Sequence, residues 1–181
     1  MAELFIDFAN SELYDGKGNL DDRLYDADWR RAFLADWGLP GHGDLDEGDL
    51  RELAELRATI RSTIERTRSG RKPTARAAER IDAALADGPV RYRLSTKGLR
   101  PHVEVVPLAE GREAIAGAVA LSFARFLADG ELDRLKTCDN RGCRWVFYDE
   151  TRNRSRRWCG PCGNVDKVRR FRERRRAAGR E

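Results

Sequence analysis

Apolar residues recur at helical spacing over four stretches of this 181-residue chain. The clearest stretch covers residues 44–69, where Glu and Arg fill the other positions around a stripe made of Leu50, Leu53, Leu56, Ile60 and Ile64. Shorter patterns predict helices over residues 25–37, 74–87 and 113–128. Gly closely follows each of the four segments, and Gly favours the end of a helix. We therefore expect four helices before residue 130.

Alternation of apolar and polar residues predicts one β-hairpin. Residues 90–94 and 102–106 both alternate, and a polar loop that contains Gly98 joins them. Residues 4–10 form a short apolar and aromatic run that fits either a buried strand or the first turn of a helix, because periodicity does not separate the two at this length. Gly and Asp residues mark a loop over residues 14–22. The expected fold class is α+β, mostly α.

The character of the sequence changes near residue 130. The helical patterns and the hairpin precede it, whereas all four cysteines and a strongly basic end follow it. Residues 138–181 have a net charge of +8, while residues 1–137 have a net charge of −4. We therefore predict two domains. A multihelical domain with one β-hairpin covers residues 1–130, and a small four-cysteine module with a basic C-terminal helix covers residues 131–181.

The overall composition is that of a charged globular protein, with 40% hydrophobic and 36% charged residues. The sequence has no apolar run of about 18 residues that could span a membrane, and its first ten residues are acidic where a secretory signal would be basic. We therefore expect a cytoplasmic protein with no membrane partner. In a reducing compartment, cysteines serve as metal ligands more often than as disulfides.

The four cysteines have the spacing of a tetrahedral zinc site: Cys138-x4-Cys143-x15-Cys159-x2-Cys162. Two close pairs point two thiolates each at one ion, and four thiolates leave no open position for a catalytic water, so we expect one structural zinc ion. We expect the stretch between the pairs to form a hairpin that brings them together. The alternative is a set of unliganded or redox-active thiols, for which Cys159 and Cys162 have suitable spacing but lack the βαβ context of thioredoxin-like enzymes.

Basic residues lie on both sides of the second cysteine pair. Residues 151–157 carry four Arg among Asn and Ser, and residues 166–176 carry seven Lys or Arg. Val168 and Phe171 have the spacing to seat a helix on the module. Guanidinium groups suit nucleic-acid phosphates, although an ordinary exposed loop can have the same composition. The expected phosphate contacts are Arg152, Arg154, Arg156, Arg157, Lys167, Arg169, Arg170 and Arg174.

The C-terminal module resembles the CGNR zinc finger of bacterial proteins. The resemblance lies in the order of Cys138, Cys143, Trp145, Phe147, Asp149, Arg156, Arg157, Trp158, Cys159, Cys162, Gly163, Asn164 and Lys167. Residues 7–10 are similar to the opening Asp-Phe-x-Asn motif of the ABATE domain, which precedes this zinc finger in the family. The resemblance implies a stress-induced transcription regulator that binds DNA.

Two features depart from the pattern of that family. Val165 stands where the fourth residue of the CGNR motif is Arg, and the gap between Cys159 and Cys162 is shorter than usual. Zinc binding should survive because a two-residue gap is itself a common zinc turn. The missing Arg would either contact phosphate or brace the fold, and its loss weakens the implied DNA binding, although Arg169 and Arg170 follow closely.

The N-terminal domain offers few candidate ligand sites. Asp7 and Asn10 lie in an apolar setting, where a buried carboxylate or amide must find partners, so they either bind a ligand, cap a helix or fix a turn. The sequence lacks GxGxxG, P-loop, HExxH and GxSxG motifs. We therefore do not expect an enzyme.

Together these observations predict a transcription regulator that binds nucleic acid, with DNA the expected form, through its zinc finger and basic helix. The N-terminal domain is then the regulatory or ligand-sensing part, with an unidentified small-molecule effector, and the sequence leaves a homodimer open. One alternative is an interaction module that binds RNA or an acidic protein, in which zinc is purely structural. Another is a small-molecule-binding domain that the zinc module only stabilises.

Overall fold

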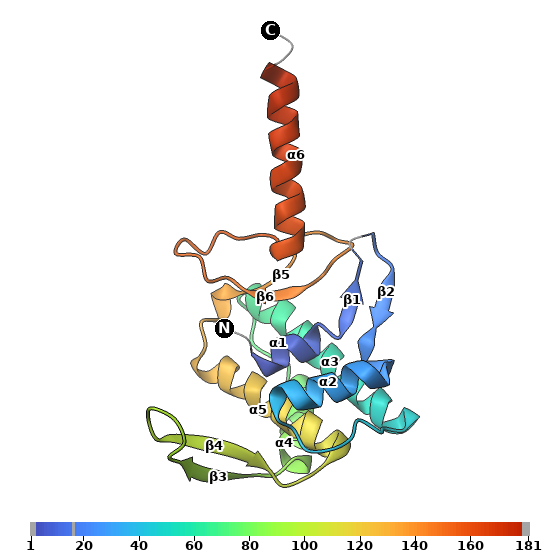
Figure 1. The fold of residues 1–181 in the computed structure, drawn as a ribbon, viewed down its shortest axis with the longest axis vertical. Coiled ribbons are helices and arrows are strands. Elements are labelled where there is room, and N and C mark those ends of the chain that lie inside the picture. The colour runs from blue at the N-terminus through green and yellow to red at the C-terminus, as the bar shows by residue number, and fades with distance from the viewer. Residues whose placement is uncertain (1–2, 16, 179–181) are drawn as a thin grey trace.

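The computed structural model describes residues 3–15 and 17–178, and the side chains of residues 169–174 and 176–178 lie outside the described part. The helices are α1 (Leu4–Ala9), α2 (Ala27–Trp37), α3 (Glu47–Arg68), α4 (Ala75–Asp87), α5 (Gly111–Asp129) and α6 (Gly160–Ala178). Three antiparallel hairpins pair β1 (Glu12–Tyr14) with β2 (Leu20–Asp22), β3 (Val90–Ser95) with β4 (His102–Pro107), and β5 (Leu135–Thr137) with β6 (Val146–Tyr148). The helices α1 to α5 build the body, and α6 projects away from it (Figure 1).

Local capping explains where the helices of the body begin and end. Asp46 accepts a hydrogen bond from the N–H of Asp49, whose carboxylate accepts one from the N–H of Asp46, so α3 begins with a capping box. The hydroxyl of Thr74 accepts from the N–H of Ala77 at the start of α4. Gly38 ends α2 in the left-handed conformation at φ 61°. The predicted helices are confirmed, with ends that differ by a few residues.

The hydrophobic core surrounds the short helix α1. Phe5 and Phe8 are fully buried, and the ring centroid of Phe5 lies 5.1 Å from that of Phe123 in α5. The leucine and isoleucine stripe of α3 is buried against the same cluster. Each large apolar side chain that is fully buried contributes about 1.5–3 kcal/mol. Residues 4–10 therefore begin with a helix and not a strand, and this helix is the centre of the core.

α4 and α5 approach each other at two glycines. A Cβ atom added to Gly88 would lie 2.5 Å from the Cα atom of Gly117, so both positions require glycine for this close packing. The β3–β4 hairpin follows directly from α4 and confirms the predicted strand pair. The fold class, α+β and mostly α, is also confirmed. The structure adds a second hairpin, β1–β2, and the loop predicted over residues 14–22 is shorter than expected because β2 occupies its last three residues.

The cysteine-containing segment packs directly on the body. Leu135 of β5 and Val146 of β6 are each 1% exposed and belong to the same hydrophobic cluster as α1, α3 and α5. The expected hairpin between the cysteine pairs is wrong, because β6 pairs with β5 upstream of Cys138 and the residues after β6 form a loop. Within the described residues, no helix has both the length and the apolar character that a membrane crossing needs.

The helix α6 differs from its prediction in how it is held. The spacing predicts that Val168 seats it on the module, but Val168 is 48% exposed and the neighbouring Val165 is 70% exposed. The side chain of Phe171, the second expected seat, lies outside the described part of the chain. The first turn of α6 contains Cys162 instead, so the cysteine cluster fixes the base of the helix.

Candidate metal centre and its basic surroundings

The four cysteine thiols converge at the base of α6. Their Sγ atoms lie within 4.8 Å of one another, and Cys138, Cys143 and Cys159 are buried. In a tetrahedral zinc site with Zn–S bonds of about 2.3 Å, sulfur atoms lie about 3.8 Å apart. The Sγ atoms of Cys143 and Cys159 lie 3.6 Å apart, close to that spacing and too far for a disulfide. The cluster fits one structural zinc ion, as the spacing predicts.

The turn between β5 and β6 positions the first cysteine pair. The N–H of Cys138 donates to the carbonyl oxygen of Trp145 at 2.8 Å, and the N–H of Cys143 donates to that of Asn140 at 2.9 Å. The side-chain amide of Asn140 also donates to the Sγ atom of Cys162 at 3.4 Å. Such a hydrogen bond orients a metal ligand and stabilises its negative charge, so the first turn supports the second pair.

The start of α6 positions the second pair. Cys159 directly precedes the helix, and its thiol accepts a hydrogen bond from the backbone N–H of Cys162, as an N-cap side chain does. The helix N-terminus favours a negatively charged thiolate. Pro161 fits there because N–H groups in the first turn have no partner within the helix. The two-residue gap therefore places both thiols at one helix end.

Burial makes two of these thiols, Cys143 and Cys159, resist ionisation in the absence of a cation. It raises the pKa of Cys143 to about 11 and also raises the pKa of Cys159. Burial opposes ionisation of Cys162 as well, but hydrogen bonds from Asn140 and Cys143 outweigh it and lower the pKa of Cys162. A zinc ion supplies the positive charge that keeps thiolates deprotonated and thereby cross-links the β5–β6 turn to α6.

Asp149 organises the loop that carries the predicted phosphate contacts. Its buried carboxylate accepts hydrogen bonds from the N–H and hydroxyl of Thr151, from the N–H of Arg156 and from Nζ of Lys136. Lys136 also donates to the carbonyl oxygens of Arg154 and Arg156. Burial alone raises the pKa of Asp149, but these hydrogen bonds lower it well below its ordinary value. The ion pair between Asp149 and Lys136 therefore fixes the backbone of the loop.

Two of the loop arginines are neutralised by carboxylates of the chain. Arg154 forms ion pairs with Glu131 and Asp133. Its hydrogen bond to Asp133 is the main cause that raises the pKa of Arg154, and the negative charges of both carboxylates raise it further. Arg157 donates from Nε to Asp139 at 2.7 Å. The charge of the loop is therefore smaller than its sequence indicates.

The other predicted phosphate contacts differ in their surroundings. The guanidinium carbon of Arg156 lies 5.0 Å from the ring centroid of Phe147, and its Nε donates to the carbonyl oxygen of Trp158. Arg152 and Lys167 are exposed, and their side chains have no hydrogen bond or ion pair with the described residues. The side chains of three further predicted contacts lie outside the described residues: Arg169, Arg170 and Arg174.

The structure gives both residues of the proposed N-terminal ligand site a partner within the protein. The side chain of Asn10 donates to the carbonyl oxygen of Val146 at 2.8 Å and accepts from its N–H at 2.8 Å. Asp7 accepts from the indole N–H of Trp37 at 2.9 Å. Asn10 is 4% exposed. Its two hydrogen bonds link the end of α1 to the edge of β6 that does not pair with β5.

Buried arginines form contacts that the sequence patterns missed. Arg61 of α3 donates to the carbonyl oxygen of Ala9 at 2.7 Å and to that of Arg144 at 2.8 Å, so it ties α1 to the turn that holds Cys143. Arg57 forms a bidentate ion pair with Asp22. The sequence offered one signal for their burial: Arg57 and Arg61 lie next to the apolar stripe in the helical pattern of residues 44–69.

The fold and the cysteine cluster define a zinc-finger protein whose finger is packed on a helical domain. The profile of the CGNR zinc finger matches residues 134–175. The profile of the ABATE domain, described as a putative stress-induced transcription regulator, matches residues 2–130. The chain therefore belongs to the ABATE family and carries a CGNR zinc finger, which confirms the resemblance. No curated protein matches the chain.

Proposed function

We propose that this chain is a transcription regulator that binds DNA through its CGNR zinc finger and α6. The observation that carries the proposal is the helix α6, which begins on the zinc ligands and projects from the body (Figure 1). Residues 166–176 of this helix contain seven Lys or Arg. The major groove of B-DNA is about 12 Å wide and admits an α-helix, and its phosphates attract such a charge.

The zinc site supports this proposal because it gives α6 a fixed base. The helix has 19 residues and is therefore about 28 Å long. A projecting helix is marginally stable by itself, since most helices in proteins are stabilised by packing. Cross-linking of Cys159 and Cys162 to the β5–β6 turn orders its first turn, and DNA would provide the remaining contacts.

The phosphate contacts divide into two groups. The first group makes the main contribution to DNA affinity. Its members are exposed or lie further along α6 in the sequence: Arg152, Lys167, Arg169, Arg170 and Arg174. The second group has partners within the chain and contributes after exchanging them: Arg154, Arg156 and Arg157. In this proposal the zinc centre of Cys138, Cys143, Cys159 and Cys162 shapes the surface and touches no DNA.

The proposal divides the chain by role as well. Residues 131–181 bind DNA, and residues 1–130 regulate that binding in response to an effector. The protein catalyses no reaction and acts in the cytoplasm. Both matching families are regulatory or zinc-finger families, which supports these assignments.

The experiment is the salt dependence of binding to duplex DNA, measured by fluorescence anisotropy on the intact zinc-loaded protein. Each phosphate contact contributes about 0.9 to the slope of log K against log salt, so the Arg169→Ala/Arg170→Ala variant should reduce the slope by about two. The control is Arg76→Ala/Arg91→Ala, which removes two exposed arginines of the N-terminal region. This control should keep the slope of the unchanged protein.

Absence of binding at low salt, with one zinc ion per chain, would overturn the proposal. Tighter binding to RNA of equal length would replace it with an RNA-binding role. Equal losses of slope in both double variants would mean that only net charge matters and that α6 is not the binding element.

A further inference from the structure

A cavity of about 920 Å³ lies between the β1–β2 hairpin and the base of α6. Figure 1 shows this hairpin extending from the body toward the finger. Small-molecule sites typically have volumes of about 300–1,000 Å³ and a lining that is mostly apolar and aromatic. This finger cavity has such side chains on each of its walls: Leu13 and Tyr14 from β1, Trp145 from the β5–β6 turn, and Trp158, Pro161 and Val165 around the start of α6.

Direct contacts hold the walls of the finger cavity together. The guanidinium carbon of Arg144, in the β5–β6 turn, lies 5.7 Å from the ring centroid of Tyr14 in β1. The side-chain amide of Asn140, in the same turn, donates to the Sγ atom of Cys162 in α6 at 3.4 Å. The turn therefore contacts both the hairpin and the helix, and the zinc ligands fix the cavity between them.

The walls of the cavity near α6 offer aromatic and apolar surface. Trp145 and Trp158 are half-buried and pack against the same cysteine cluster. Val165 is 70% exposed and stands where the CGNR motif has Arg, so the apolar surface continues onto the helix. An apolar ligand would remove this surface from water, which favours binding.

The charges around the cavity disfavour an anionic ligand. The zinc centre forms one wall, and its four thiolates carry two more negative charges than a zinc ion balances. Asp15 and Asp166 also line the cavity, and Lys17 opposes only part of their charge. Like charges repel across such a site, so a neutral ligand fits better than an anion.

We propose that the finger cavity binds a neutral planar molecule of two or more fused aromatic rings. The rings lie against Trp145 and Trp158 and contact Val165. Stacking between aromatic rings adds about two- to tenfold in affinity beyond the burial of apolar surface. An aromatic ligand therefore binds more tightly than a saturated molecule of the same size.

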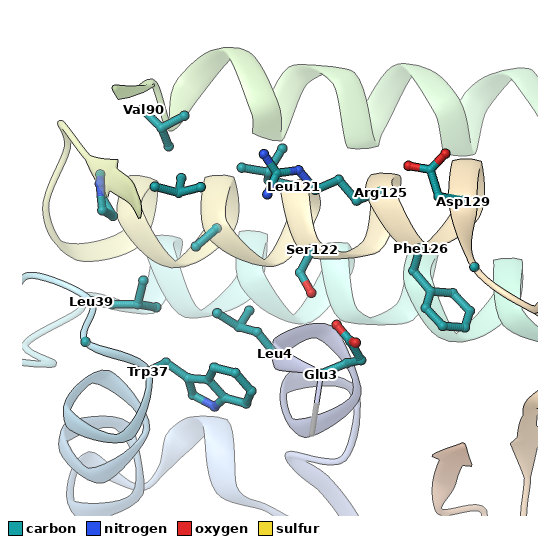
Figure 2. Close-up of a pocket in the computed structure, with 15 residues that line it drawn as sticks. Glu3, Leu4, Trp37, Leu39, Val90, Leu121, Ser122, Arg125, Phe126 and Asp129 are labelled. Carbon is teal, nitrogen blue, oxygen red and sulfur yellow. The ribbon is translucent and has the colours of Figure 1, made fainter. Parts of the chain in front are cut away.

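The groove along α5, of about 460 Å³, suits such a ligand less well. Figure 2 shows the guanidinium of Arg125 beside Leu121, so a charged group interrupts the apolar lining. The described residues that line this groove all precede residue 131. A ligand there would touch neither the cysteines nor α6.

A ligand in the finger cavity would act as the effector of the regulator, a consequence that rests on the proposed DNA binding. The zinc ligands fix the first turn of α6, whereas Val165 and Val168 further along are exposed. A molecule that contacts both β1 and Val165 adds a second attachment, which pre-organises the helix for DNA. We expect DNA affinity to rise by at least about fivefold, the lower end of typical coupling between sites.

The test is calorimetric titration of the full zinc-loaded chain with 2-naphthol, with its saturated analogue decahydro-2-naphthol and with the anion 2-naphthoate. 2-Naphthol should bind at least about threefold more tightly than the saturated analogue, and the anion should bind most weakly. Equal binding of 2-naphthol and the analogue, tightest binding of the anion, or no binding of 2-naphthol would overturn the proposal.

Two variants with matched controls locate the site. Val165→Asp should weaken 2-naphthol binding by at least about threefold, whereas Val168→Asp changes an exposed valine of α6 outside the described lining and should not. Tyr14→Ala should also weaken binding. Its control, Tyr92→Ala, removes another strand tyrosine that lies beside an arginine and should keep the affinity. Equal affinities within either pair would overturn the assignment to this cavity.

Fluorescence anisotropy then measures DNA affinity with and without 2-naphthol. An unchanged or lower DNA affinity would overturn the regulatory consequence. An absence of DNA binding would overturn the proposed function, while calorimetry reports on the finger cavity in both cases.

Discussion

Asn10 provides for one residue of β6 the hydrogen bonds that a neighbouring strand would provide. Its amide is paired with both the N–H and the carbonyl oxygen of Val146, which lie in the core. In Asn10→Ala both backbone groups lose their partner, and each buried unsatisfied group costs about 1–3 kcal/mol. We therefore expect the free energy of unfolding to fall by about 2–4 kcal/mol in urea denaturation.

A matched variant separates this role from the general effect of removing an amide. Asn153 is exposed, and its side chain has no hydrogen bond with the described residues. Asn153→Ala should change the free energy of unfolding by less than about 0.5 kcal/mol. An Asn10→Ala variant as stable as the Asn153→Ala variant would contradict the assigned role of Asn10.

The buried carboxylate of Asp149 makes stability depend on pH. Its pKa in the folded protein lies well below the ordinary value, despite burial, because Lys136, Thr151 and the N–H of Arg156 donate to it. A lowered pKa contributes stability above the unfolded pKa, and this contribution is lost as pH falls below about 4. Asp149→Asn should therefore be less stable near neutral pH and should lose less stability on acidification, as measured by denaturant midpoints.

The control for Asp149 is a carboxylate outside any such network. Asp36 is exposed on α2, and its carboxylate has no hydrogen bond or ion pair with the described residues. Asp36→Asn should follow the acid profile of the unchanged protein. If Asp149→Asn follows it too, the carboxylate of Asp149 does not stabilise the fold.

Residue roles were predictable where partners are close in sequence. The four cysteines lie within 25 residues of one another, and their spacing alone predicted the metal cluster. The partner of Asn10 lies 136 positions away, so no local pattern revealed it. Arg57 and Arg61 were also missed, because Arg is abundant throughout this chain and their burial depends on how α3 meets α1 and β2.

At the scale of elements, periodicity predicted the long helices because each buries one apolar stripe. The three-residue strands β1, β2 and β5 were missed, since alternation needs about four residues to be recognised. The start of α6 was missed for another reason. It depends on metal ligands at Cys159 and Cys162, and hydrophobic spacing does not report such an anchor.

The ion pairs of Arg154 give a prediction for the loop as an element. Glu131 and Asp133 hold its guanidinium, so the Glu131→Gln/Asp133→Asn variant releases Arg154 at the surface. Arg134 also loses its ion pair with Glu131, but the carbonyl oxygens of Asp149 and Thr151 still hold it. If Arg154 then contacts a phosphate, DNA affinity should increase and the salt slope should steepen by about one. Salt-dependent fluorescence anisotropy with duplex DNA measures both quantities.

Charge alone could also raise DNA affinity, and a distant variant separates the two effects. Glu79→Gln/Asp82→Asn removes the same charge from the exposed face of α4. It should leave the slope unchanged. An Arg154→Ala change in the released background should restore the original slope, and failure to do so would contradict a phosphate contact by Arg154.

At the scale of the whole molecule, the zinc finger and the helical domain share one core. The sequence placed a boundary near residue 130, yet Leu135 and Val146 lie buried with α1, α3 and α5. The composition changes near residue 130 because the four cysteines and the excess of basic residues follow it. Composition does not show which side chains are buried together. We therefore expect the stability of the helical body to depend on the metal.

Removal of zinc tests this dependence. Loss of the metal should unfold the finger and expose Leu135 and Val146. The burial of each of these side chains contributes about 1.5–3 kcal/mol to stability, and this contribution is then lost. Asn10 also loses its partner in β6. For a chain of this size, 1 kcal/mol shifts Tm by about 2–4 °C, so chelation should lower the Tm of the helical body by about 10 °C. Circular dichroism of the helices during heating measures this shift, and added zinc should reverse it. If the helices melt at an unchanged temperature after chelation, the finger does not stabilise the body, and the contacts at Val146 and Leu135 contribute little to its folding.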